Sequence, residues 1–222
     1  MQPTSNTRVK ICCMGSVAEA WLAIAHGAAA VGLVSEMPSG PGVISGDLIA
    51  EISAKLPPAI GSFLLTCQPD PQTIIEQQRR LRVNTIQICD RLEVLSYETL
   101  RNALPGVSLV QVIHVNGTDS VAEAISIAPF VDAVLLDSGN QSLPVKELGG
   151  TGRTHDWKLS RQIREAINVP VFLAGGLKAE NVAEAIRQVR PFGVDVCSGV
   201  RTNGKLDEEK LRAFFAAVTG AG

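Results

Sequence analysis

Two side chains of this sequence have the type and the position for acid–base chemistry. Cys12 lies at the end of the first β-rich run, and Asp137 directly follows the apolar residues 134–136. A carboxyl group at the end of a buried strand rarely serves packing, because burying it unpaired is costly, so Asp137 suits a general acid. A cysteine becomes a base when nearby positive charge lowers its pKa, and Lys10 shares one strand face with Cys12. The alternatives are a cap of the following loop for Asp137 and an inert buried thiol for Cys12.

Three glycine-rich segments have the composition of phosphate-binding loops. They are Gly149-Gly150-Thr151-Gly152, Gly175-Gly176 and Ser198-Gly199. The second and third follow the last two β-rich runs, where backbone N–H groups and a helix N-terminus can bind a phosphate. One pair of glycines usually marks only a turn. Two such loops on adjacent strands favour a phosphate site over plain turns.

Short β-rich runs alternate with longer segments of helical spacing along the whole chain. The expected strands are residues 9–13, 30–35, 60–66, 85–89, 108–114, 132–137, 169–174 and 193–198. Helices are expected at residues 17–25, 71–81, 120–128, 157–167, 179–189 and 208–218. The expected helix starts are marked by Ser16, by Asp70 with Pro71, by Asp119 or Ser120, and by Asp207.

This alternation predicts an α/β protein with a single (β/α)8 barrel over residues 1–222, of which residues 1–8 form a polar extension. The strand runs are continuously apolar, as is usual for strands covered on both faces. A doubly wound open sheet is the alternative, because periodicity does not reveal whether a sheet closes. The loops at residues 37–46 and 138–154 would lie on the face where barrel enzymes carry their sites.

The composition excludes several classes of function. Of the 222 residues, 45% are hydrophobic and 19% are charged, and the formal net charge is -2. The chain therefore lacks a basic surface for nucleic acid, and its apolar runs are too short to cross a membrane. Five cysteines without a Cys-x-x-Cys pair argue against a metal site and against a disulfide framework. Because no secretory leader is evident, we expect a reducing, cytoplasmic location.

Several segments together resemble the phosphoribosylanthranilate isomerases of tryptophan biosynthesis. They are Lys10-Ile11-Cys12, Leu135-Leu136-Asp137-Ser138, Gly149-Gly150-Thr151-Gly152 with Asp156-Trp157, Leu173-Ala174-Gly175-Gly176-Leu177 with Glu180-Asn181-Val182, and Gly193-Val194-Asp195-Val196-Cys197-Ser198-Gly199-Val200. They span nearly the whole chain in the order of that family. The resemblance implies a (β/α)8 fold and a cofactor-free Amadori rearrangement of N-(5-phosphoribosyl)anthranilate to 1-(2-carboxyphenylamino)-1-deoxyribulose 5-phosphate.

The same resemblance implies roles for individual residues. Asp137 would protonate the ribose ring oxygen, and Cys12 would remove the proton from C2 of the sugar. The 5-phosphate would be bound by Gly152, Gly175, Gly176, Ser198 and Gly199, and further substrate contacts would come from Lys10 and Arg201. The expected partner is a small phosphorylated substrate, with no metal, nucleic acid or membrane, and the chain would act as a monomer or homodimer.

The sequence departs from the family pattern at several positions around the expected substrate site, most of them in the front half of the chain. Cys13 stands where the family usually has glycine, and strand parity predicts that its side chain points away from the barrel axis. Residues 39–42, Ser-Gly-Pro-Gly, lack the arginine that contacts the anthranilate carboxylate in the family. Residues 86–90 lack a Leu-His-Gly ending. Arg201 replaces a glutamate, and it could supply the missing positive charge from across the barrel mouth.

These departures leave two other functions open. The chain could isomerise a different phosphorylated aminosugar, because the arginine that grips the carboxylate is missing. It could also be a catalytically silent barrel that binds a phosphoribosyl ligand, because a fold does not by itself determine activity. The presence of both Cys12 and Asp137 counts against the silent barrel.

Overall fold

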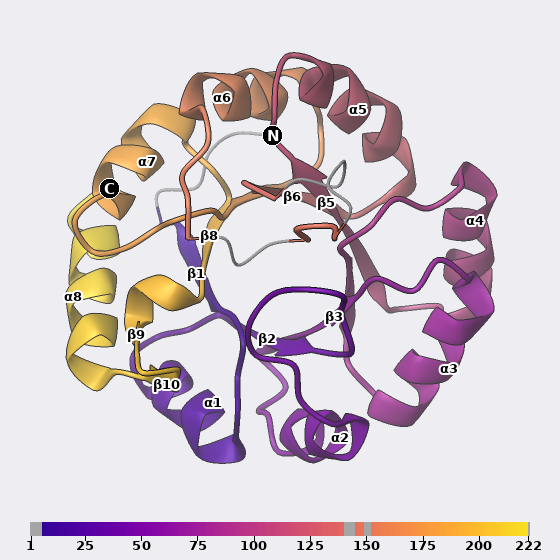
Figure 1. Ribbon diagram of the computed structural model, residues 1–222, viewed down its shortest axis with the longest axis horizontal. Coiled ribbons are helices and arrows are strands. Elements are labelled where there is room, and N and C mark those ends of the chain that lie inside the picture. The colour runs from indigo at the N-terminus through magenta and orange to yellow at the C-terminus, as the bar shows by residue number, and fades with distance from the viewer. Residues whose placement is uncertain (1–5, 140–144, 149–151, 222) are drawn as a thin grey trace.

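The chain folds into a closed barrel of parallel strands surrounded by helices (Figure 1). The computed structural model describes residues 6–139, 145–148 and 152–221. Its barrel strands are β1 (Arg8–Ile11), β2 (Ala30–Val34), β3 (Gly61–Thr66), β4 (Thr85–Ile88), β5 (Ser108–His114), β6 (Ala133–Asp137), β7 (Val171–Leu173) and β8 (Gly193–Val196). Each strand pairs with the next, and β8 pairs with β1, which closes the ring. The predicted (β/α)8 barrel is confirmed, and the open doubly wound sheet is excluded.

A helix follows each barrel strand on the outside of the ring (Figure 1). The described helices are α1 (Val17–Ala25), α2 (Gly46–Ala54), α3 (Pro71–Leu81), α4 (Val94–Ala103), α5 (Asp119–Ile127), α6 (Trp157–Ala166), α7 (Val182–Val189) and α8 (Glu208–Thr219). The smaller elements are the 3-10 turns η1 (Ala128–Phe130) and η2 (Ser198–Val200) and the hairpin of β9 (Arg201–Thr202) and β10 (Lys205–Leu206). Within the described residues, no helix is both long enough and apolar enough to span a membrane.

Side-chain caps explain why several helices begin where the sequence predicts. Ser16 accepts a hydrogen bond from a backbone N–H of the first turn of α1, and Asp207 does the same for α8. Asp70 accepts two such bonds at the start of α3, which begins with Pro71. These caps satisfy N–H groups that have no partner within the helix. The prediction for α5 is wrong, because the N-cap is Thr118, without a side-chain hydrogen bond, and Asp119 and Ser120 already lie in the helix.

The start of α7 differs from the prediction because of a side chain in the preceding turn. Asn181 accepts a hydrogen bond from the N–H of Lys178 and donates one to the carbonyl oxygen of Gly176. These bonds hold residues 177–181 as a turn, and the helix begins only at Val182. The turn directly follows the glycine pair after β7, so it also determines the shape of that loop.

Two apolar layers support the barrel. One lies between the strands and the helices and includes Ile11 and Leu136, and the other fills the barrel interior and includes Leu135 and Phe172. Consecutive residues of a strand enter different layers because side chains alternate across a strand. The interior layer reaches the carboxyl ends of the strands, where Cys12, Val34 and Leu65 belong to it.

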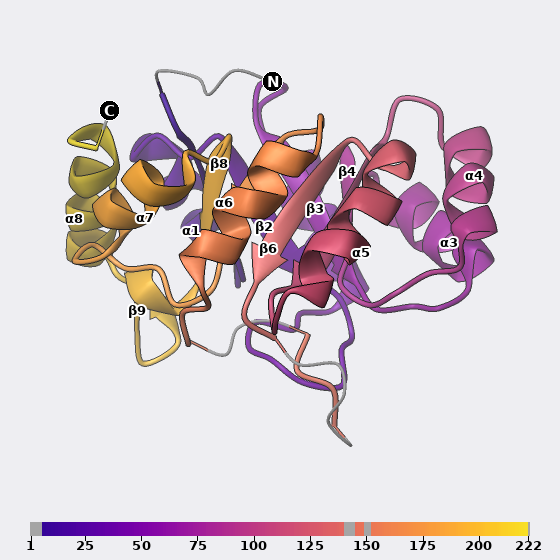
Figure 2. The same ribbon diagram turned by 90° about the horizontal axis from the view of Figure 1, so that it is seen from above.

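The loops after β2 and β6 project from the same end of the barrel (Figure 2). The hydroxyl group of Ser39 donates to the carbonyl oxygen of Lys146, which connects the two loops. The Lys146 ammonium group pairs with the carboxylate of Asp90, which follows β4. Three residues of the first predicted glycine cluster, Gly149, Gly150 and Thr151, lie outside the described residues.

Candidate active site

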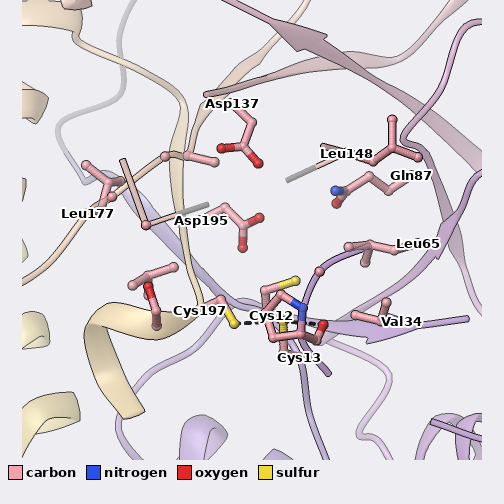
Figure 3. A pocket seen from close by; sticks show the side chains of 18 of the residues that line it. Cys12, Cys13, Val34, Leu65, Gln87, Asp137, Leu148, Leu177, Asp195 and Cys197 are labelled. Atoms are coloured by element: carbon pink, nitrogen blue, oxygen red, sulfur yellow. Dashed lines mark hydrogen bonds between the residues drawn. The ribbon is translucent and has the colours of Figure 1, made fainter. Parts of the chain in front are cut away.

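A cavity opens at the carboxyl ends of the barrel strands (Figure 3). It is lined by most of the predicted site residues, namely Cys12, Asp137, Gly152, Gly175, Gly176 and Ser198. Gly199 lines an adjoining depression. Lys10 and Arg201 are not in the lining, because Lys10 is wholly buried and Arg201 is engaged by Glu19 of α1. The tertiary structure thus brings residues from both ends of the chain to one site.

Cys12 directly follows β1 and lies at the wall of the cavity (Figure 3). Its backbone N–H donates to the carbonyl oxygen of Val196 at 2.8 Å, so pairing with β8 continues past the end of β1. Gly32 of β2 faces the thiol. A Cβ atom on that glycine would lie 2.7 Å from Sγ of Cys12 and 3.1 Å from Nζ of Lys10. Glycine at this position therefore makes room for the thiol and for the ammonium group, which share one face as predicted.

Asp137 is the last residue of β6, and its carboxyl group lies across the cavity from Cys12 (Figure 3). The side chain is buried, and Oδ1 accepts a hydrogen bond from the N–H of Ser138 at 2.7 Å. This bond orients the carboxyl group at the point where the strand ends. An acid at this position can reach a ligand that fills the cavity.

Cys13 lies in the wall of the cavity, so the prediction that it points away from the barrel axis is wrong (Figure 3). Strand alternation ends before this residue, and Cys13 has a left-handed backbone with φ of 63°. Its Sγ lies 2.7 Å from Sγ of Cys197 and 3.6 Å from the carbonyl oxygen of Pro41. Hydrogen bonding with Cys12 and Cys197 raises the pKa of Cys13, whereas the hydrogen bond with Cys13 lowers the pKa of Cys197.

A buried ion pair lies within the barrel near Cys12. Nζ of Lys10 lies 2.9 Å from Oδ2 of Asp195, and the lysine side chain is wholly buried. Burial alone would lower the pKa of Lys10, but the Asp195 carboxylate outweighs burial, and the pKa lies above its ordinary value. Burial raises the pKa of Asp195, and the charge of Lys10 opposes that rise. The ammonium group therefore stays protonated at neutral pH.

Asp195 also belongs to the wall of the cavity, although it is not among the predicted site residues. Its Oδ1 is buried and has no hydrogen-bond partner within the described part of the chain. A carboxylate oxygen in this position can accept a hydrogen bond from a ligand hydroxyl group. The signal in the sequence is an acidic residue inside an otherwise apolar strand, which is costly unless the charge is paired.

The loops after β7 and β8 meet beside the cavity. Gly175 and Gly176 have φ angles of 83° and 61°, a region that favours glycine. A Cβ atom on Gly176 would lie 2.7 Å from the backbone of Arg153, and one on Gly199 would lie 2.0 Å from the carbonyl oxygen of Leu177. Only residues without a side chain allow these backbone segments to approach so closely.

The depression next to these loops has the features of an anion site. Its wall includes Gly152, Gly176, Ser198 and Gly199 together with the basic side chains Lys178 and Lys210. The N-terminus of α7 follows the same loop, and this end of the helix carries partial positive charge. A phosphate group fits this combination of glycine backbone, helix terminus and ammonium groups.

Arg201 joins three parts of the chain instead of facing the cavity. Its guanidinium group makes two hydrogen bonds with the carboxylate of Glu19, at 3.1 and 3.0 Å. It also donates to the carbonyl oxygens of Cys13 and Gly204. Burial opposes the charge of Arg201, but the bonds to Glu19 outweigh burial and raise its pKa. The two terminal nitrogens of the guanidinium group are therefore engaged by the protein, whereas the buried Nε has no hydrogen-bond partner among the described residues.

The opposite part of the cavity wall is mostly apolar. It includes Val34, Leu65 and Leu148, with the amide of Gln87 among them (Figure 3). Met37 also lines the cavity. Oε1 of Gln87 is buried, and among the described residues it has no hydrogen-bond partner. Within the described chain, the cavity wall contains no arginine or lysine. The arginine that is missing from the loop after β2 is thus not replaced in this wall.

Known proteins with the same fold and a similar sequence identify the family. The family model for N-(5'phosphoribosyl)anthranilate (PRA) isomerase matches residues 9–217. N-(5'-phosphoribosyl)anthranilate isomerase 1 of Methanosarcina mazei is 35% identical, over 98% of this chain and 97% of that protein.

Solved structures agree with this match. A phosphoribosyl anthranilate isomerase in complex with reduced 1-(o-carboxyphenylamino)-1-deoxyribulose 5-phosphate has a TM-score of 0.80 at 27% identity, covering 96% of this chain and 99% of that one. Monomers generated from the dimeric isomerase of Thermotoga maritima have a TM-score of 0.79 at 26% identity, with the same coverage. This chain therefore belongs to the family of N-(5'-phosphoribosyl)anthranilate isomerases.

Proposed function

We propose that this protein isomerises N-(5'-phosphoribosyl)anthranilate to 1-(2-carboxyphenylamino)-1-deoxyribulose 5-phosphate in tryptophan biosynthesis, with Asp137 as the general acid and Cys12 as the general base. The strongest support is that these two side chains lie on opposite sides of one cavity, beside loops suited to a phosphate. Groups placed in this way can act on the ring oxygen and on the C2 proton of one bound sugar. The family to which the chain belongs carries out this reaction.

The reaction requires two protons to be donated, to the ring oxygen and to C1, and two to be removed, from C2 and from O2. Asp137 protonates the ribose ring oxygen, the bond between that oxygen and C1 breaks, and the amine lone pair forms a C=N bond at C1. The thiolate of Cys12 removes the proton from C2, and the electrons of that bond form an enolamine. Loss of the O2 proton and protonation of C1 give the ketose. C2 is oxidised as C1 is reduced, so the electrons balance within the substrate.

The phosphate is bound by the glycine loops in this proposal. Backbone N–H groups of Gly176, Ser198 and Gly199 would donate to its oxygens, and Lys178 and Lys210 would add positive charge. Gly152 and Gly175 would complete the wall on the β6 and β7 sides. Phosphate binding at this edge would leave the sugar between the acid and the base.

A second candidate substrate, another phosphorylated aminosugar, is favoured by one observation. Within the described chain, no arginine or lysine lines the apolar part of the cavity that would hold the anthranilate ring. A carboxylate there would rely on neutral donors such as the Gln87 amide, and these bind a charge more weakly than a guanidinium group does. Substrate range separates the two candidates. Binding of the reduced product analogue that is at least 10-fold tighter with its carboxylate than without it would exclude the second.

The first test is an activity assay with acid and base variants. The labile substrate is made in place from anthranilate and phosphoribosyl pyrophosphate by a transferase, and the fall of its fluorescence is followed. C12S and D137N should each lose at least ~10²-fold in turnover, as expected for loss of a general base or acid. C67S is the matched control, because Cys67 is half-buried and outside the cavity wall. Near wild-type turnover of either site variant would remove that residue from the mechanism.

Assembly and location are part of the same proposal. We infer one domain that acts as a monomer or a homodimer, since a relative of this fold is described as dimeric. The cytoplasm is the proposed compartment because all five cysteines are free thiols, which a reducing environment preserves. Sedimentation of the purified chain and localisation of a tagged copy would test these two statements.

A further inference from the structure

A partly buried histidine, His155, lies beside the proposed acid and has no role in the mechanism above. Its position can be measured from Gly175, which lies between the two side chains. A Cβ atom on that glycine would lie 3.0 Å from Nδ1 of His155 and 3.3 Å from Oδ1 of Asp137. The two atoms are therefore no further apart than the sum of these distances, and both face the same small space in the cavity wall.

The histidine ring is held from its other side. Nε2 lies 2.7 Å from the hydroxyl oxygen of Ser160, which is wholly buried in α6. Nδ1 is also buried, and within the described chain it has no hydrogen-bond partner. A buried ring nitrogen without a partner costs free energy, so this atom is suited to a partner that the working site brings close.

The surroundings of His155 determine which nitrogen carries its proton. Burial lowers the pKa of His155, although the nearby charge of Asp137 opposes the change, so the ring is neutral with one N–H. The oxygens nearest to the space that Nδ1 faces are Oδ1 of Asp137 and the carbonyl oxygen of Arg153, and both are acceptors. A proton on Nδ1 faces these acceptors, and Nε2 is then free to accept from the Ser160 hydroxyl.

We propose that His155 is a positioning residue for the acid, with its Nδ1–H donating to Oδ1 of Asp137. This oxygen already accepts from the N–H of Ser138. The Ser138 hydroxyl also donates to Oδ1, at 3.4 Å. Donors gathered on Oδ1 leave the acidic proton on Oδ2, the oxygen that must deliver it to the substrate. This role rests on the proposed function of Asp137 as the general acid.

The test compares two substitutions of the same ring. H155F keeps a planar ring of similar size but has no nitrogen, and H155N keeps an N–H donor close to the position of Nδ1. We expect H155F to lower kcat roughly 10-fold with KM within about 2-fold, as expected for one hydrogen bond to a carboxyl group. H155N should recover most of that loss. S160A, which frees the ring without removing it, should give a smaller fall in kcat.

Two outcomes overturn the proposal. One is wild-type kcat in H155F, and the other is an equal fall of kcat in H155F and H155N, which would mean that the ring only fills space. A measurement on the wild-type protein covers the case in which H155F does not fold. Nitrogen NMR of labelled histidine should find the Nδ1-protonated tautomer, and an Nε2-protonated ring would overturn the proposal as well.

The double variant separates this proposal from the proposed function. If Asp137 is the acid and His155 acts through it, H155F should cause no further fall of kcat in the D137N background. Activity that persists in D137N alone would refute the acid role itself. A further 10-fold fall in the double variant would keep the acid role and refute the coupling to His155.

Discussion

Three thiols and two carboxyl groups share one cavity, and each has different neighbours. Cys12 lies near the Lys10–Asp195 pair, whereas the free thiols of Cys13 and Cys197 form a hydrogen bond with each other. The carboxyl groups differ as well, because Asp195 is paired with a buried ammonium group and Asp137 is not. Chemically similar side chains can therefore take separate roles, with Asp137 as a proton donor and Asp195 as a fixed charge.

Hydrogen peroxide is expected to join Cys13 to Cys197. Their Sγ atoms lie 2.7 Å apart, so little movement is needed to reach the S–S bond length of ~2.05 Å. The hydrogen bond with Cys13 lowers the pKa of Cys197, which makes Cys197 the more readily ionised thiol of the two. Its oxidation to a sulfenic acid releases one water, and attack by Cys13 forms the disulfide and releases a second. Peptide mapping should find the 13–197 link and a mass lower by two hydrogens. C197S should block the link, and a link from Cys12 instead would contradict the prediction.

The buried ion pair gives a prediction about stability. K10M leaves the carboxylate of Asp195 buried without its cation, so the free energy of unfolding should fall by about 3 kcal/mol at neutral pH. Urea unfolding measures this change. The matched control is K55A, which removes an exposed pair with Glu51 and should cost ~0.5 kcal/mol or less. An equal fall in the free energy of unfolding of the two variants would show that burial of the Lys10–Asp195 pair does not add to its contribution to stability.

The pH dependence of K10M has a defined sign. Burial raises the pKa of Asp195, and removal of Lys10 takes away the charge that opposes this rise. The folded variant then binds a proton that the unfolded chain does not, over the interval between the folded-state and unfolded-state pKa values. Its free energy of unfolding should rise as the pH falls from neutral into that interval. The difference in the free energy of unfolding between K10M and the wild type should therefore become smaller at acidic pH. A larger difference would show that protonation of Asp195 is not its cause.

At the scale of elements, the junctions between strands and helices form the site. The turn before α7 shows how, because the Asn181 side chain donates to the carbonyl oxygen of Gly176 and accepts from the N–H of Lys178, at the end of the glycine pair that faces the proposed phosphate. The residues 177–181 stay out of the helix for this reason. A short cap motif thus shapes a binding loop as well as starting a helix.

Loss of this turn should weaken substrate binding rather than chemistry. N181A removes both hydrogen bonds, so KM should rise roughly 5-fold while kcat stays within about 2-fold, a change on the order of one or two hydrogen bonds. Steady-state kinetics measures both constants. D70A is the control, since it removes the cap of α3, which lines neither the cavity nor the adjoining depression, and should lower stability with KM unchanged. A fall in kcat alone would contradict this role of the turn.

For the whole molecule, the important junction is where the first and last strands meet. Arg201 follows η2, and it bonds Glu19 of α1, the carbonyl oxygen of Cys13 after β1, and that of Gly204 in the β9–β10 hairpin. The closed ring depends on β1 and β8, which are distant in sequence, so the chain must pay the entropy of closing nearly its full length. The contacts of Arg201 stabilise that closure.

Removal of the partner of Arg201 should therefore destabilise the barrel. E19A leaves a largely buried guanidinium group without its carboxylate, and the free energy of unfolding should fall by about 2 kcal/mol. Urea unfolding should show this with one cooperative transition. E51A removes an exposed carboxylate and should change stability by ~0.5 kcal/mol or less. A fall no larger than in that control would mean that the junction contributes little.

Local signals in the sequence predict much of the fold. The caps Ser16, Asp70 and Asp207 predict helix starts correctly because a cap acts on N–H groups two or three residues away. The strand runs were placed to within a few residues because both faces of a barrel strand are apolar. Closure was a prediction from alternation alone, and only the pairing of β1 with β8 establishes it.

The sequence by itself determined the α/β alternation, the glycine loops, and the placement of Cys12 and Asp137 at strand ends, because these depend on neighbours along the chain. Only the tertiary structure decided where the long-range partners lie. It turned Cys13 into the cavity through a left-handed backbone, and it paired Lys10 with Asp195. It also bound Arg201 to Glu19. The physical reason is that charge pairing and the space beyond a strand end depend on atoms that are remote in sequence and meet only when the barrel closes.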